Sequence, residues 1–438
     1  MTPAARIASV IELLGLIEEN GAPADRTVAD YLRQRRFIGS KDRHALVSRT
    51  FGLLRRKASL DWWLARTAPG LSAGPRARVL VDLVLEEGWS ADRASGSFDG
   101  QRHHPSPLSG EERRLLRALQ GQHVRDQAQP EWVRLEVPPW LLPRLKAALG
   151  VNYRVELAAL MGEAPLDLRA NTLKATRGQV LAALAEAGTE ATLTPLSPLG
   201  LRVAERKAVA DTKAFRDGWF EIQDEGSQVA AAMVDARPGM RVVDFCAGAG
   251  GKTLAMAASM GNKGQIVACD VLEGRLTHSV TRLHRAGVHN VTRRPLSSER
   301  DPWVKRHKAS FDRVLVDAPC SGSGTWRRSP DAKWRMGEGD IAELIALQPA
   351  ILDSASRLVK PGGRLVYVTC SLLAEENEGQ IEEFLAGSAD FALVPAETVW
   401  PAVIGSAYPG SGPMLRLSPA AHGTDGFFIA VLERVPTS

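Results

Sequence analysis

The segment RVVDFCAGAGGKT, residues 241–253, is the part of the chain that decides its fold. It begins with apolar residues that predict a buried strand over 241–246, and it continues as a glycine-rich turn that leads into a helix. Because glycine has no side chain, such a turn lets the backbone approach a ligand closely. The segment therefore predicts a ligand-binding site at the end of a strand.

Two observations limit the kinds of ligand that this turn can bind. A dinucleotide, a nucleoside triphosphate or S-adenosylmethionine would each fit, but a P-loop needs a glycine where this sequence has Cys246. The next predicted strand ends in Asp270, about 20 residues after the turn, where an acidic residue accepts hydrogen bonds from ribose hydroxyls. The pattern favours a nucleoside-containing cofactor.

Apolar runs alternate with helical patterns beyond this segment, which predicts parallel βαβ units and an α/β fold. Strands are predicted over 241–246, 265–270, 290–293, 311–317 and 364–370, and helices over 276–286 and 341–359.

The residues before the α/β region predict two further domains. Ile7, Val10, Leu14 and Ile17 recur at helical spacing, and the first 145 residues as a whole are predicted to be helical. A smaller α/β unit follows, with a strand over 166–169 and a helix over 177–187 that Gly188 closes. The expected organisation is thus a helical domain over 1–145, a small α/β domain over 146–220 that guides a substrate, and a main domain over 221–438.

Cys320 and Cys370 end two apolar segments, 314–320 and 365–370, that include the ends of two predicted strands. Ligands of open α/β sheets bind outside the carboxyl ends of the strands, so both thiols are expected at one crevice. There, one thiol can attack a substrate while the other handles a proton. An isolated cysteine at a strand end is more often a small buried apolar residue, which is the interpretation that Cys246 and Cys269 keep.

The charge of the chain favours a polyanionic partner. The net charge is only +5, but basic residues are concentrated in two stretches. These are Arg293, Arg294, Arg300, Lys305, Arg306, Lys308 and Arg313, and then Arg327, Arg328, Lys333 and Arg335.

No metal site, disulfide scaffold or membrane segment is expected. The four cysteines form no Cys-x-x-Cys pair, and no apolar run approaches the ~20 residues that span a bilayer. The N-terminus has no signal-peptide pattern. We therefore expect a cytoplasmic protein with reduced thiols.

Several motifs together carry a family resemblance. They are Asp317–Gly324 (DAPCSGSG), 367–371 (YVTCS), 328–334 (RSPDAKW), 223–228 (QDEGSQ), 168–174 (LRANTLK) and 423–428 (GTDGFF). With the glycine turn, they resemble the RNA cytosine-C5 methyltransferases, most closely the bacterial Fmu/Sun group that acts on 16S rRNA. The resemblance implies a class I, Rossmann-like S-adenosylmethionine-dependent methyltransferase domain, preceded by a NusB-like helical RNA-binding domain. It also implies an RNA partner, rRNA in particular, and a monomer.

The resemblance also implies roles for individual residues. Cys370 would be the nucleophile, Cys320 would help to release the product, Asp317 would bind the cytosine edge and border the cofactor, and Lys252 would lie near that site. The methionine part of the cofactor would be held by Cys246, Ala247, Gly248, Ala249, Gly250, Gly251 and Lys252. Asp270 would bind its ribose.

The sequence departs from the family pattern at the adenine site. An aspartate that usually follows the third strand is missing from 290–298, so backbone groups or Ser297 would replace it. Two alternatives stay open. A DNA-type cytosine methyltransferase would use Cys320 as nucleophile, but its Glu-Asn-Val motif is absent. The other alternative is a non-catalytic RNA-binding assembly factor that has kept the fold.

Overall fold

The computed structural model describes residues 1–204 and 209–436, and the chain divides into two compact units. The helical unit comprises Met1–Lys146, Tyr153–Gly162 and Trp326–Gly337. The sheet unit comprises Ala147–Asn152, Glu163–Thr325 and Glu338–Ser438. A short piece of the C-terminal half therefore belongs to the same unit as the N-terminal helices.

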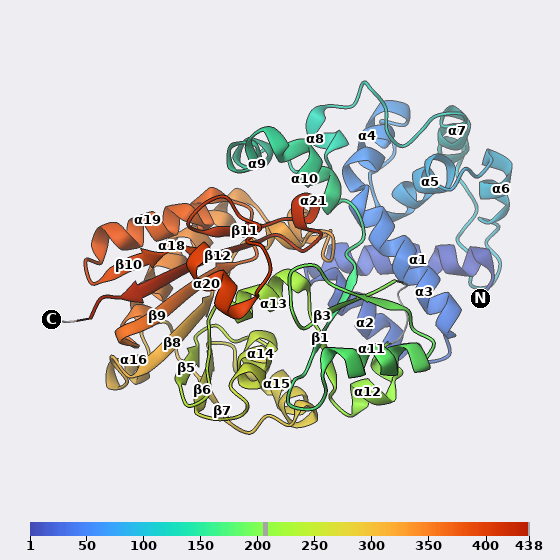
Figure 1. The fold of residues 1–438 in the computed structure, drawn as a ribbon. Helices are drawn as coiled ribbons and strands as arrows, with labels where there is room; N and C mark the ends of the chain where they lie inside the picture. Colours follow the sequence, from blue (N-terminus) through green and yellow to red (C-terminus); the bar gives the residue numbers. More distant parts are fainter. Residues whose placement is uncertain (205–208, 437–438) are drawn as a thin grey trace. The chain divides into compact units, whose positions relative to one another are not determined.

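The helical pattern predicted for the first 145 residues is confirmed, and its apolar positions form one core. Ile7, Val10, Leu14 and Ile17 are buried on α1 (Pro3–Asn20), which Thr2 caps by accepting a hydrogen bond from the Ala5 amide. The other helices up to residue 162 are α2 (Ala24–Gln34), α3 (Ser40–Arg55), α4 (Lys57–Thr67), α5 (Pro75–Leu85), α6 (Ala91–Gly96), α7 (Gly110–Ala118), α8 (Glu131–Arg134), α9 (Leu142–Leu149) and α10 (Tyr153–Leu160). Figure 1 draws the first of them in blue and the last in green.

Trp326–Gly337, with its short helix α17 (Ala332–Arg335), is bonded into the helical unit. Asp331 Oδ2 accepts a hydrogen bond from the Ala24 amide at 3.1 Å, and Arg55 Nη2 donates to the Arg327 carbonyl at 2.9 Å. Arg327 and Lys333 are buried. The prediction that these two cations contribute to an exposed basic stretch was therefore wrong.

The small sheet of the sheet unit is antiparallel, in the order β2-β3-β1-β4. Its strands are β1 (Leu166–Ala170), β2 (Ala191–Leu193), β3 (Gly200–Val203) and β4 (Phe220–Ile222), and its helices are α11 (Arg177–Glu186) and α12 (Lys213–Arg216). A capping box of Thr176 and Gln179 starts α11. The strand and helix predicted in this region are thus confirmed to within one residue at each end.

The large sheet has the order β10-β12-β9-β8-β5-β6-β7, with β11 paired to β12. The strands are β5 (Arg241–Asp244), β6 (Gln265–Asp270), β7 (Val291–Pro295), β8 (Phe311–Asp317), β9 (Val359–Thr369), β10 (Phe391–Val394), β11 (Leu415–Leu417) and β12 (Phe427–Arg434). β5 to β9 are parallel, whereas β12 is antiparallel to β9. This is the Rossmann-like sheet that the sequence predicted, extended by antiparallel strands at one edge.

Helices cover both faces of the large sheet (Figure 1). They are α13 (Glu225–Ala232), α14 (Gly251–Ser259), α15 (Glu273–Ala286), α16 (Pro302–Arg306), α18 (Glu338–Ser356), α19 (Glu378–Gly387), α20 (Ala396–Val403) and α21 (Pro419–His422). Alternate strand residues enter two cores: Val314 packs with residues of α18, and Leu315 packs with residues of α13 and α14. Burial on both faces explains why β5, β6, β8 and β9 contain continuous apolar runs in the sequence, whereas the edge strand β7 (VTRRP) does not.

The helix predicted over 341–359 ends earlier, at Ser356. Val359 already belongs to β9, where it pairs with Phe311 of β8. Local periodicity favoured helix, but pairing with a remote strand fixed these residues as sheet.

Strand order reverses at β5, because the chain runs from β5 through β6 to β7 on one side and returns through β8 to β9 on the other. Such a switch point opens a crevice at the carboxyl ends of the strands. Over the described ranges, no helix combines the length and the apolar character needed to cross a bilayer.

Candidate active site

A cavity of about 790 Å³ lies at this switch point. Among its lining residues are Cys246, Ala247, Gly248, Ala249, Gly251, Lys252, Asp270, Asp317, Cys320 and Cys370. Nearly all residues predicted to bind the cofactor or the substrate are therefore brought together in one place. Cavities of this size hold ligands as large as a nucleoside cofactor.

Gly250 is the predicted cofactor residue that does not line the cavity. It precedes α14 with a φ of 80°, and a Cβ built there would lie 3.0 Å from the Cβ of Ser279. Gly250 therefore shapes the turn, by its left-handed backbone and close approach to α15, rather than facing a ligand.

Asp270 stabilises the same turn by hydrogen bonds. Its Oδ2 accepts a hydrogen bond from the Gly248 amide and its Oδ1 one from the Leu272 amide, both at 2.8 Å. The carboxylate is nearly buried but lines the cavity. Each oxygen keeps a further lone pair, so the side chain can still accept a bond from a ribose hydroxyl.

Sequence reasoning missed an apolar wall of the cavity. Val271 and Leu272 are 56% and 57% exposed, and Leu296 lies with them along the cavity. Two exposed aliphatic residues directly after a strand are the signal that could have indicated it. This wall suits a flat aromatic base such as adenine.

Ser297 also lines the cavity, at the place where the family aspartate is missing. Its hydroxyl donates a hydrogen bond to Asp301 Oδ2 at 2.9 Å. Because the hydroxyl proton is engaged there, the oxygen offers lone pairs to a ligand amine. The geometry is compatible with the substitution predicted from the sequence.

Lys252 and Asp317 form an ion pair inside the cavity, with Lys252 Nζ 2.6 Å from Asp317 Oδ2. Burial by itself would lower the pKa of Lys252, but the Asp317 carboxylate outweighs burial and the pKa of the ammonium is raised. Lys252 therefore carries its positive charge at neutral pH.

The two thiols predicted to meet at the crevice do so, since Cys320 Sγ lies 3.5 Å from Cys370 Sγ. Both side chains are half-buried. The hydrogen bond to Cys370, together with burial, raises the pKa of Cys320 well above its usual range. Cys320 is thus a protonated thiol at neutral pH, held against the sulfur of Cys370.

The other two cysteines differ in position: Cys269 is fully buried in the core of the sheet, whereas Cys246 packs against that core and lines the cavity. Burial raises the pKa of both thiols. Both are neutral thiols at neutral pH, and the roles given to them in the sequence analysis stay predictions.

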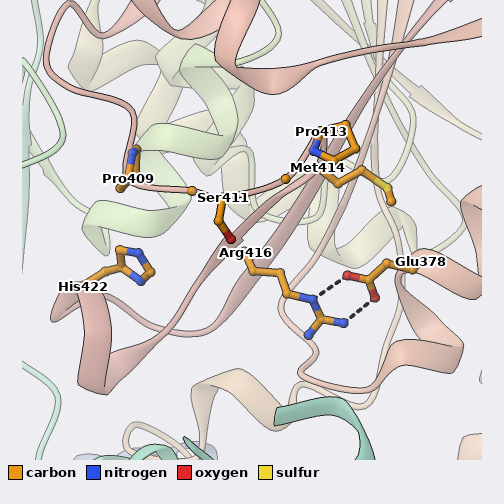
Figure 2. A pocket seen from close by; sticks show the side chains of 9 residues that line it. Glu378, Pro409, Ser411, Pro413, Met414, Arg416 and His422 are labelled. Carbon is orange, nitrogen blue, oxygen red and sulfur yellow. Dashed lines mark hydrogen bonds and ion pairs between the residues drawn. The ribbon is translucent and has the colours of Figure 1, made fainter. Parts of the chain in front are cut away.

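A second, smaller cavity of about 380 Å³ is lined by Glu378, His422 and residues between Pro409 and Arg416 (Figure 2). Arg416 of β11 forms an ion pair with Glu378 of α19 there, and its Nη1 also donates to the Leu372 carbonyl at 3.4 Å. None of the predicted site residues lines this cavity.

Comparisons with known proteins place the chain in a family. Residues 231–433 match the family model described as 16S rRNA methyltransferase RsmB/F, and residues 137–210 match its ferredoxin-like domain. The ribosomal RNA small subunit methyltransferase B of Erwinia tasmaniensis is 31% identical over 407 residues, which cover 91% of this chain and 92% of the relative. This chain belongs to the RsmB/F methyltransferase family.

Solved structures agree with this assignment. The crystal structure of PH0851 superimposes on this RsmB/F methyltransferase with a TM-score of 0.80 and 29% identity, over 99% of both chains. A methyltransferase homologue from Pyrococcus horikoshii has a TM-score of 0.60 and 31% identity, over 69% of this chain and 97% of its own.

Proposed function

We propose that the protein is an S-adenosylmethionine-dependent methyltransferase that methylates C5 of a cytosine in 16S rRNA, with Cys370 as nucleophile. The observation that carries the proposal is the cavity in which a pair of thiols 3.5 Å apart shares one wall with the Lys252–Asp317 ion pair. The family assignment supplies the reaction class, because the named relatives are small-subunit rRNA methyltransferases.

The chemistry explains the need for a thiolate. C5 of cytosine is a poor nucleophile, so Cys370 Sγ forms a bond to C6 and moves electron density to C5. S-adenosylmethionine supplies an electrophilic methyl group on its sulfonium. Afterwards a base must take the C5 proton; the electron pair of that C–H bond then re-forms the C5–C6 double bond while the Sγ–C6 bond breaks and leaves a thiolate on Cys370.

The remaining side chains of the cavity support these steps. Asp317 holds the cytosine edge, and the ammonium of Lys252 stabilises negative charge that develops beside it. Cys320 Sγ lies 3.5 Å from Cys370 Sγ, and we assign it to the release of Cys370 from C6.

The cofactor fits the residues that line the cavity. The 246–252 turn would hold the methionine part, with Gly250 shaping the turn, Asp270 would accept from the ribose, and the wall of Val271, Leu272 and Leu296 would contact adenine. Ser297 would accept from the adenine amine in place of the missing aspartate.

RNA binding is assigned to the parts outside the cavity. We propose a NusB-like RNA-binding domain over 1–145, a substrate-guiding domain over 146–220 and the catalytic domain over 221–438. Exposed cations at Arg293, Arg300, Lys305, Arg306 and Lys308 suit a phosphate backbone. A monomeric state and a cytoplasmic location stay predictions from the sequence.

Separate substitution of the two cysteines tests the mechanism. With labelled cofactor and 16S rRNA, Cys370→Ala is expected to abolish both methyl transfer and the covalent RNA adduct on denaturing gels. Cys320→Ala is expected to let that adduct accumulate. Cys269→Ala, which changes a thiol outside the cavity, is the control.

The outcomes also separate the alternatives. Normal turnover by Cys370→Ala would exclude it as the nucleophile, and loss of the adduct in Cys320→Ala alone would indicate the DNA-type arrangement. No incorporation by the wild type into any RNA would favour a non-catalytic assembly factor. Bisulfite sequencing of rRNA with and without the gene would identify the modified base.

A further inference from the structure

Glu376 is a buried carboxylate that neither the cavity nor the mechanism uses. It ends the 3-10 turn η4 (Ala374–Glu376), six residues after Cys370, and its exposed fraction is 0%. Among the described residues, none of its partners is basic, so all of its hydrogen bonds come from neutral donors. A buried anion without a cation is costly, and it persists only where its hydrogen bonds are satisfied.

The donors to Glu376 are the residues that directly follow the two active-site cysteines. Ser321, after Cys320, donates its amide to Oε1 at 2.8 Å and its hydroxyl to Oε2 at 2.5 Å. Ser371, after Cys370, donates its hydroxyl to the same Oε2. One carboxylate therefore ties together the two chain segments that carry the thiols.

Further bonds close this connection. Gln348 of α18 is fully buried and donates to the Pro319 carbonyl at 3.0 Å and to Glu376 Oε1 at 3.2 Å. Ser323 Oγ accepts from the Leu372 amide at 2.8 Å. The loops after β8 and β9 thus share one buried network, whose serines, Gln348 and Glu376 do not line the cavity.

The charge of Glu376 matters for the strength of this network. Hydrogen bonds to an ionised acceptor are roughly twice as strong as neutral ones, and two hydroxyls, a backbone amide and the side-chain amide of Gln348 converge on this group. The same negative charge adds to the causes that raise the pKa of Cys320. If the network served stability alone, there would be no need for its two serines to be the residues that directly follow the two cysteines.

We infer that Glu376 is a positioning residue that sets the spacing of Cys320 and Cys370 by holding Ser321 and Ser371 on one carboxylate. The inference rests on the proposed roles of the two thiols. It adds to the proposed mechanism a residue that touches neither substrate nor cofactor.

Glu376→Gln is the direct test. The amide keeps the size of the side chain but replaces one acceptor oxygen by a donor. If the amide oxygen accepts from the two serine hydroxyls, the NH2 group faces the Ser321 amide and Gln348 Nε2, which are donors themselves; in the reverse orientation both hydroxyl bonds are lost. We expect kcat to fall about 100-fold, the size of effect that a small displacement of reacting groups produces. KM for S-adenosylmethionine should not change, because Glu376 does not line the cavity.

A second readout measures the spacing without RNA. Diamide oxidises two neighbouring thiols to one disulfide and is itself reduced to the hydrazine, taking up two electrons and two protons. We expect the Cys320–Cys370 disulfide to form roughly 10-fold more slowly in Glu376→Gln, as peptide mass spectrometry would show. Glu383→Gln, the same change on an exposed position of α19, should match the wild type in both experiments.

The outcomes are distinct. Wild-type kcat and a wild-type diamide rate in Glu376→Gln would overturn the inference. If the wild type methylates no RNA but the diamide rates still differ, the proposed function fails and the positioning role stands.

If Glu376→Gln does not fold, the variants Ser321→Ala and Ser371→Ala test the inference instead. Each removes one hydroxyl and should lower kcat, and the double variant should lose less than the product of the two single losses, because both act through one carboxylate. Independent, fully multiplicative losses, or no loss at all, would contradict the inference.

Discussion

Asp244 ends β5 beneath the cofactor turn with an incompletely satisfied carboxylate. Its Oδ2 accepts from the Thr253 hydroxyl at 2.6 Å, whereas its Oδ1 is buried and has no partner among the described residues. Burial raises the pKa of Asp244 to about 7, against a small opposing effect of the Thr253 hydrogen bond. The group therefore changes its charge near neutral pH.

This shift makes stability depend on pH. An unfolded aspartate has a pKa of about 3.9, so between that value and neutrality the native state binds more protons than the unfolded chain. The contribution of Asp244 to the free energy of unfolding therefore falls as pH rises from about 4 to about 7. Asp244→Asn stays neutral at every pH. The free energy of unfolding of this variant minus that of the wild type, measured with urea, should therefore be larger at about pH 8 than at about pH 5. An equal difference at both pH values would refute the assignment.

The raised pKa of Cys320 leads to a prediction about how fast this thiol reacts with an alkylating reagent. Because the hydrogen bond to Cys370 and burial raise its pKa, Cys320 should react with iodoacetamide at neutral pH at least roughly 10-fold more slowly than glutathione, an exposed thiol. Cys370→Ala removes the first of these causes, so it should speed the labelling of Cys320. Labelling followed by mass spectrometry measures both rates, and equal rates in the variant and the wild type would contradict this cause.

At the level of single residues, the sequence was sufficient to predict the position of side chains that lie at the ends of strands. Cys320 and Cys370 could be placed together because β8 and β9 are adjacent parallel strands. Glu376 could not be predicted, because the chain turns back after β9 and buries an acidic residue that looks like a surface position. Lys333 was misjudged for the same reason, since a basic sequence does not show which tertiary contacts cover it.

Among the elements, β4 and α15 are joined by a cluster around Glu221. This carboxylate is 3% exposed and forms ion pairs with Arg282 and Arg285, and Arg282 Nη1 also donates to the Ala249 carbonyl of the cofactor turn at 2.8 Å. The small sheet therefore helps to hold the turn that faces the cofactor.

Removing this carboxylate should destabilise the protein and weaken cofactor binding. Glu221→Ala leaves two partly buried arginines without the carboxylate that neutralises them, which costs about 3 kcal/mol. Chemical unfolding and calorimetric titration with S-adenosylmethionine would measure both effects. Glu433→Ala breaks the more exposed pair with Arg364 and should cost less than about 1 kcal/mol; a similar loss in both variants would contradict this account.

The parallel core was predictable as a set of elements, whereas its antiparallel edge was not. β5, β6, β8 and β9 contain apolar runs bounded by turns, which local periodicity detects, whereas β7 (VTRRP) is largely polar. β12 (FFIAVLER) is an equally apolar run, but nothing in its own residues specifies that it inserts between β9 and β10. That position depends on pairing with strands far away in the sequence.

At the scale of the whole chain, the helical unit includes residues from the catalytic half. A fragment that begins at residue 163 would expose Trp326, Asp331 and Lys333, which are buried in the complete protein. We expect limited proteolysis of this fragment to cleave within 326–337 much faster than in the full chain. Equal protection of this segment in the two proteins would contradict its assignment to the helical unit.

The return of residues 326–337 to the first helices also has a consequence for biosynthesis. The amide of Ala24 can form its hydrogen bond only after Asp331 has been synthesised. About 190 residues separate Lys146 from the end of the 326–337 segment. At typical translation speeds this interval lasts roughly 10–40 s. During that time the nascent N-terminal half lacks its last partner, so the half-made polypeptide, more than the finished enzyme, is the form in need of chaperones.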